Sequence, residues 1–205
     1  MNQYITETEY AVKNLIELVS KENVKLEEMK TSLSIAEAKY KHNKWDFETS
    51  DMNDDFSDAH VMGAFQRMAS AHNESSELQI EINLLQALIG SRQSAIQAIC
   101  GAILQISKQG ISVVHTRKAN APEGRYIGSV NIRDIIWEAR NQAIHFEENS
   151  LNQRVTALFQ TLEAENGAEF DLNAHLKQSR AKQVINLLGW DVYANYSSDM
   201  QSLLP

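Results

Sequence analysis

The chain has 205 residues, with 27 Asp and Glu against 19 Lys and Arg, for a net charge of −8. Its 43% hydrophobic and 22% charged residues are typical of a globular protein and exclude wholesale disorder and collagen-like repeats. The negative charge argues against a protein that coats nucleic acid by neutralising many phosphates, and the single cysteine excludes an internal disulfide.

No secretory signal is expected, because residues 1–9 are polar and lack an apolar core region. The most apolar stretch, Ala95 to Leu104, contains Gln97 and is about half of the ~20 residues that span a bilayer. Together with the single cysteine, this indicates a reducing compartment. We therefore expect a soluble cytoplasmic protein with no membrane partner.

Two prolines and few alternating apolar runs predict an all-α chain, a helical bundle with a long N-terminal helix. That helix is expected to begin near Thr6 or Thr8 and to end near Tyr40. Its apolar residues recur every three or four positions, at Val12, Leu15, Val19, Leu26, Met29, Leu33, Ala36 and Tyr40. Such a seam packs against another helix at a shallow angle. We favour packing within the chain over dimerisation for this seam.

An acidic segment without Lys or Arg, from Asp46 to Asp58, is predicted to connect the first helix to the next. A second helix is expected from Asp58 to His72. A third begins at Ser76, which can cap it, and ends at Gly110. The pattern leaves open whether residues 73–76 are a true break or a stutter within one helix.

Basic residues gather between Lys108 and Arg133 and are opposed only by Glu123. Residues 116–128 lack periodicity and are predicted to form a loop. A local basic stretch on an acidic protein can hold a short anionic ligand, and a solvated loop is the alternative interpretation. The candidate substrate-binding residues are Arg117, Lys118, Arg125 and Arg133.

The C-terminal part predicts three more helices and a tail that packs back on them. The helices are expected from Ser129 or Asn131 to Phe146, from after Asn149 to before Gly167, and from Asn173 to Leu188, where Gly189 ends the last one. We expect a single domain made of a helical arm (1–50), a bundle (58–190) and a tail (191–205).

The helix over 131–148 carries the residues with chemical potential. At about 100° per residue, its isoleucines and alanines share one arc, and Asp134, Glu138, Asn141 and His145 share the opposite one. Asn141 and His145 lie one turn apart, so the amide can orient the imidazole. Arg140 lies on the flank, and its side chain is long enough for both heads to converge on one phosphate.

The spacing of an arginine, a polar residue, three further residues and a histidine is present in Arg140-Asn141-Gln142-Ala143-Ile144-His145. In this motif the chain resembles the HEPN (higher eukaryotes and prokaryotes nucleotide-binding) superfamily. Members are all-helical bundles, and many are metal-independent endoribonucleases of toxin–antitoxin and other defence systems. The resemblance implies a cleft between two protomers, where a substrate 2′-hydroxyl attacks the adjacent phosphodiester and leaves a cyclic phosphate.

The resemblance also assigns roles. His145 is the general acid or base, Arg140 stabilises charge on the phosphorane, and Asn141 holds the histidine. Glu138 is a candidate modulator of the histidine. Glu147 stands where a prominent toxin branch has a modified tyrosine, so regulation through that tyrosine is not expected.

The predicted function is that of a homodimeric, metal-independent endoribonuclease, a toxin or antiphage component that acts on RNA without a cofactor and has an antitoxin protein as a partner. The alternative is a catalytically inactive HEPN-like helical module that binds a partner protein or a nucleotide. In that case His145 only interacts with the helix dipole, and Arg140 only forms a salt bridge with Glu138 or Glu147.

Overall fold

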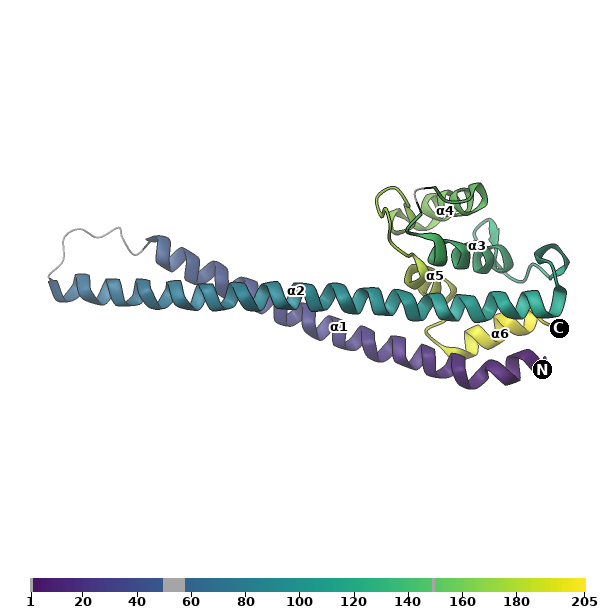
Figure 1. Cartoon of the computed structure of the whole chain (residues 1–205), viewed down its shortest axis with the longest axis horizontal. Coiled ribbons are helices and arrows are strands. Elements are labelled where there is room, and N and C mark those ends of the chain that lie inside the picture. The colour runs from purple at the N-terminus through teal and green to yellow at the C-terminus, as the bar shows by residue number, and fades with distance from the viewer. Residues whose placement is uncertain (1, 50–57, 149) are drawn as a thin grey trace. The chain divides into compact units, whose positions relative to one another are not determined.

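The computed structural model describes residues 2–49, 58–148 and 150–205, and between residues 46 and 71 it describes only some of the side chains. The middle of the expected acidic connector, residues 50–57, lies outside the described residues. Within the described ranges the chain is all-α, as predicted (Figure 1). Its helices are α1 (Gln3–Thr49), α2 (Asp58–His115), α3 (Ile132–His145), α4 (Gln153–Asn166), α5 (Ala181–Leu188) and α6 (Tyr193–Leu203).

The chain divides into two compact units. Unit 1 comprises Met1–Asn23 with Ser94–Pro205, and unit 2 comprises Val24–Gln93. The first part of α1 belongs with the C-terminal half because Tyr4 Oη donates a hydrogen bond to the carbonyl of Ile106, 2.8 Å away. Lys13 Nζ of α1 likewise lies 4.7 Å from the ring centre of Tyr193 at the start of α6.

The tail packs against the rest of unit 1, as expected. Figure 1 shows α6 beside the first part of α1 and the last part of α2. Trp190 and Tyr196 are buried and meet edge to face with ring centres 4.9 Å apart, a favoured aromatic geometry. Nε2 of His115, the last residue of α2, lies 2.7 Å from the carbonyl oxygen of Leu203.

The apolar seam of α1 is covered within the chain. Val12 and Val19 are buried in unit 1, and Leu26 and Ala36 are buried in unit 2. In unit 2, Ile82 of α2 is also buried. This confirms the preference for intramolecular packing and leaves little of the seam for a partner helix.

The helix α2 is continuous from Asp58 to His115, so residues 73–76, where the sequence pattern left a break open, do not interrupt it. Ser76 Oγ donates a hydrogen bond to the carbonyl of His72 one turn back, instead of capping a new helix. Gly110 does not end the helix either. A Cβ atom at Gly110 would lie 2.8 Å from Tyr4 Cε1, so this glycine allows the close approach of α1.

The segment after α2 contains more structure than the predicted loop. It holds a 3₁₀ turn, Lys118–Asn120, and a two-stranded antiparallel ribbon of β1 (Tyr126–Ile127) and β2 (Val130–Asn131). Gly128, between the strands, has φ +57°, in the left-handed region that suits glycine.

The helices α3 and α4 confirm their predicted spans. Asn131 caps α3 by accepting a hydrogen bond from the amide of Asp134. The prediction of helix over residues 173–180 is wrong, because α5 begins only at Ala181. The reason is a long-range contact, since Gln142 of α3 binds the backbone of Gln178 and Arg180 and so fixes a non-helical path. α5 ends at Gly189 (φ +68°), as predicted.

Candidate functional site

The helix α3 presents its expected apolar face to the core of unit 1. Ile132, Ile135, Ile136 and Ala139 are buried, and Gly101 of α2 lies opposite Ala143. The polar residues of α3 differ in exposure: Glu138 and Gln142 are buried, whereas Arg140 and Asn141 are partly exposed and His145 is exposed. Their geometry decides what the Arg140–His145 motif can do.

A continuous chain of hydrogen bonds runs along the polar side of α3 and is called the polar chain here. Lys118 Nζ lies 2.8 Å from Glu138 Oε1 and 3.2 Å from Asp134 Oδ1. The other Glu138 oxygen accepts from Asn141 Nδ2 at 3.1 Å. Asn141 Oδ1 in turn accepts from Arg140 Nη1 at 3.2 Å. Glu138 is only 4% exposed, so its charge is balanced by Lys118 and kept from the solvent.

Arg140 is half-buried and held by two neutral amides. Its Nε donates to Gln105 Oε1 of α2 at 2.5 Å, and its Nη1 donates to Asn141. In the part of the chain that the structure describes, neither Glu138 nor Glu147 pairs with the guanidinium, so the expected alternative of a salt bridge is not found. The guanidinium is therefore positioned while its charge remains without a carboxylate partner.

A second cation lies one turn further along the contact between α2 and α3. Lys108 Nζ of α2 is 4.5 Å from the ring centre of Trp137. Lys108 follows Gln105 by one turn, and Trp137 precedes Arg140 by one turn, so both pairs lie along one seam between the helices. Two positive groups and an aromatic ring thus line the α2–α3 seam.

His145 is the last residue of α3, and its side chain is 48% exposed. Its Nδ1 lies 2.5 Å from Glu148 Oε1. The expectation that Asn141 holds the histidine is therefore not met, because the Asn141 amide is used by Arg140 and Glu138. Glu138, the expected modulator, is likewise engaged by Lys118 and Asn141. Nε2 of His145 makes no hydrogen bond to the described residues.

Two of the four predicted substrate-binding residues have structural roles instead. Arg125 binds both oxygens of Asp199, at 2.7 and 2.9 Å, and donates to the carbonyl of Leu188. The hydrogen bond with Asp199 raises the pKa of Arg125 above its ordinary value. Arg133 is 13% exposed and donates to the carbonyl of Ala121 at 2.8 Å.

The other two basic residues differ from each other. Lys118 is neutralised by Glu138 and Asp134 at the end of the polar chain. Arg117 is exposed, and its side chain makes no hydrogen bond or ion pair with the described residues. Of the four candidates, only Arg117 has a charged group that forms no hydrogen bond or ion pair with the described residues and can therefore bind an anion.

The structure adds three residues beside the motif that the sequence did not predict, Gln105, Lys108 and Glu148. Glu148 follows His145 by three residues, and that spacing is a usable signal for a helix-end pair. Gln105 is 35 positions from Arg140, so only the tertiary structure identifies it. Lys108 was part of the basic stretch, but its contact with Trp137 depends on the packing of α2 on α3.

No family model, characterised protein or solved structure matches the chain significantly. Among the described residues, no helix is both long and apolar enough to cross a membrane. The same residues contain no group of three or more His, Cys, Asp or Glu side chains arranged to hold a metal ion.

Proposed function

We propose that this protein is a metal-independent endoribonuclease of the HEPN type that acts in the cytoplasm as a homodimer, as part of a toxin or antiphage system. The observation that carries the proposal is the state of Arg140, which two neutral amides hold in place without a carboxylate partner. The same helix ends in His145, whose exposed imidazole is paired with Glu148. An anchored cation and an oriented imidazole are the groups that phosphodiester transfer needs.

The reaction assigned to these groups is an internal transfer. The 2′-oxygen of a ribose attacks the adjacent phosphorus, a base takes the 2′-hydroxyl proton, and the 5′-oxygen leaves with a proton from an acid. A 2′,3′-cyclic phosphate and a 5′-hydroxyl result. His145 Nε2 is the proton-transfer atom, and Glu148 on Nδ1 orients the ring. Arg140 stabilises the extra negative charge of the phosphorane.

A homodimer supplies the second proton-transfer group that this reaction requires. Arg140 and His145 are five residues apart, which is about 140° of rotation on one helix. A second α3 across a two-fold axis would bring a further imidazole and guanidinium to the same phosphate. Lys108 and Arg117 are the additional cations best placed to bind the flanking phosphates of RNA, because neither is neutralised by a carboxylate of the described residues.

The test compares RNA cleavage by the wild-type protein with that of His145→Ala and Arg140→Ala. Removing a general acid or base costs about 10²–10⁴-fold, which is the loss expected for His145→Ala. Removing a donor that stabilises developing charge costs about 10²–10³-fold, which is the loss expected for Arg140→Ala, and both variants should keep their helicity. Arg154→Ala, an exposed arginine on α4, is the matched control and should retain full activity. Cleavage that persists equally in all three variants would refute the assignment.

A second candidate function is a catalytically inactive helical module that binds a partner protein. It is favoured by an exposed apolar stripe on α2 within unit 2, where Ile80, Leu84 and Leu88 are 70%, 58% and 46% exposed. These residues recur every four positions and so share one helix face. This candidate predicts no RNA cleavage even with excess protein. Growth inhibition upon expression, relieved by His145→Ala, would favour the nuclease over the inactive module.

A further inference from the structure

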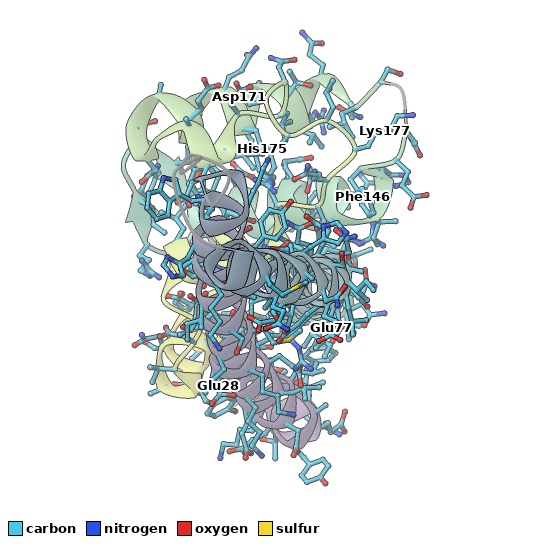
Figure 2. All side chains as sticks on the ribbon, turned by 90° about the vertical axis from the view of Figure 1, so that its left-hand side faces the viewer. Glu28, Glu77, Phe146, Asp171, His175 and Lys177 are labelled. Atoms are coloured by element: carbon cyan, nitrogen blue, oxygen red, sulfur yellow. The ribbon has the colours of Figure 1, made fainter. Side chains whose placement is uncertain are left out.

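A cavity of about 550 Å³ lies within unit 1, between the end of α3, the helix α4 and residues 171–178. Its wall includes Glu148, whose carboxylate is bound to His145. It also includes Phe146, which directly follows His145 in the chain. Figure 2 labels Phe146 just after α3, and His175 and Lys177 between α4 and α5, and all three line this cavity. The cavity, called the α3–α4 cavity here, therefore opens next to the candidate catalytic pair.

The far wall of the α3–α4 cavity is held in shape by Gln142, which lies inside the Arg140–His145 motif. Gln142 is 1% exposed, and both ends of its amide are used. Nε2 donates to the carbonyl of Gln178 at 2.9 Å, and Oε1 accepts from the amide of Arg180 at 2.8 Å. Lys177 is fixed in the left-handed region at φ +54°. The helix that carries the motif thus also shapes the cavity.

The chemistry of the lining combines aromatic surface with unused amides. The half-buried Phe146 supplies aromatic surface, whereas Phe159, also in the wall, is only 1% exposed. Gln160 of α4 and Asn173 are exposed, and their side-chain amides make no hydrogen bond to the described residues. Proteins that recognise single-stranded RNA stack splayed bases on aromatic side chains and bind the base edges through such polar groups. A volume of this size is in the range of small-molecule sites.

We infer that the α3–α4 cavity binds the nucleobase of a nucleotide next to the scissile phosphate, and that Gln160 and Asn173 read the edge of that base. The inference rests on the proposed ribonuclease function, because it takes its ligand from the RNA bound at His145. A side-chain amide both donates and accepts hydrogen bonds, so it can distinguish bases by the pattern of donors and acceptors along the base edge. Exposed Lys177 at the rim supplies a charge for the neighbouring phosphate.

The first experiment measures binding without cleavage. Non-cleavable 2′-deoxy dinucleotides that carry each of the four bases are titrated into the full-length protein and followed by calorimetry. We expect one base or base class to bind most tightly, and the Gln160→Ala/Asn173→Ala variant to lose about tenfold in affinity for it, the effect of one to two hydrogen bonds. Gln153→Ala, an exposed amide on α4 outside the cavity, should bind as the wild type does.

The outcomes separate this inference from the proposed function. Equal affinity of the wild type and the double variant for all four dinucleotides, or equal binding of abasic ribose 5-phosphate, would overturn the base site. Wild-type cleavage that has a base preference, and a double variant that cleaves without that preference, would support it. Base-selective binding that depends on the two amides, in a protein that cleaves no RNA, would retain the cavity assignment while the nuclease proposal fails.

Discussion

The Nδ1 atom of His145 lies 2.5 Å from the Oε1 atom of Glu148, so the imidazole that ends α3 is paired with a carboxylate three residues further along the chain. This pair leaves Nε2 as the ring atom available for proton transfer. Asn141 accepts a hydrogen bond from Arg140 instead of binding the imidazole. Arg140 and His145 are thus held by different residues. Each can therefore be tested independently.

Glu148→Gln should reduce RNA cleavage by about tenfold, because the imidazole loses its charged hydrogen-bond partner and the remaining hydrogen bond orients the ring more weakly. Glu147→Gln is the matched control, since Glu147 is exposed and has no hydrogen bond to His145. The measurement compares the steady-state cleavage rates of Glu148→Gln and Glu147→Gln, and the first should be lower. Equal rates would show that the carboxylate does not assist the histidine.

Gln105→Ala should also reduce cleavage, by about tenfold, because Arg140 loses the acceptor that fixes its Nε. The loss should be smaller than that of Arg140→Ala, since the guanidinium charge remains. Gln109→Ala on the same helix is exposed and should behave as the wild type. A Gln105 variant with full activity would mean that the positioning of Arg140 does not limit the reaction.

Arg125 and Arg117 should separate stability from RNA binding. Arg125→Ala removes the partner of Asp199 and should lower the free energy of unfolding by about 1–2 kcal/mol, while RNA affinity stays unchanged. Arg117→Ala should leave the stability unchanged and weaken RNA binding about two- to tenfold at low salt, because an exposed cation contributes mainly through phosphates. Chemical denaturation and filter binding measure the two quantities. A weaker RNA affinity in Arg125→Ala alone would reverse the assignment.

The lowered pKa of Asp134 leads us to expect that the protein loses folding stability in acid. Burial by itself raises its pKa, but the hydrogen bond from Asn131 and the ammonium of Lys118 outweigh burial and hold the pKa below the ordinary value of 3.8. A carboxyl with a depressed folded-state pKa stabilises the fold above its unfolded-state pKa, and that contribution is lost as the pH falls through the folded-state value. The free energy of unfolding of the wild type, measured by denaturation at a series of pH values, should therefore decline below about pH 4.

The control for this pH dependence is Asp134→Asn, which cannot titrate. Between pH 7 and pH 2.5, the stability of the variant should fall less steeply than that of the wild type. The variant should also be less stable at pH 7, since it lacks the ion pair with Lys118. Parallel curves for the two proteins would show that Asp134 titrates alike in the folded and unfolded chains.

Local signals in the sequence predict α3, α4 and the end of α5, because Asn131, Asn152 and Gly189 act through their immediate neighbours. The failures have long-range causes. Gly110 lies within α2 as the residue that leaves room for Tyr4, more than a hundred positions away, and does not end the helix. Residues 173–180 are not helical because Gln142 binds their backbone, a contact that periodicity cannot reveal.

The candidate site follows the same division. The motif places Arg140 and His145 on one helix, and the structure agrees. Composition alone makes Arg125 and Arg133 resemble ligand-binding residues, whereas their partners Asp199 and Ala121 become neighbours only through folding. The anchor of Arg140 on Gln105 is equally invisible in the sequence, since the two residues belong to different helices.

The most direct test of the central claim is the chemistry of the RNA ends. Purified wild-type protein is incubated with single-stranded RNA in the presence of a chelator, and the products are analysed by mass spectrometry. We expect fragments that end in a 2′,3′-cyclic phosphate and begin with a 5′-hydroxyl. We expect no such fragments with His145→Ala. Intact RNA at all protein concentrations, or fragments that carry 5′-phosphates, would contradict the central claim.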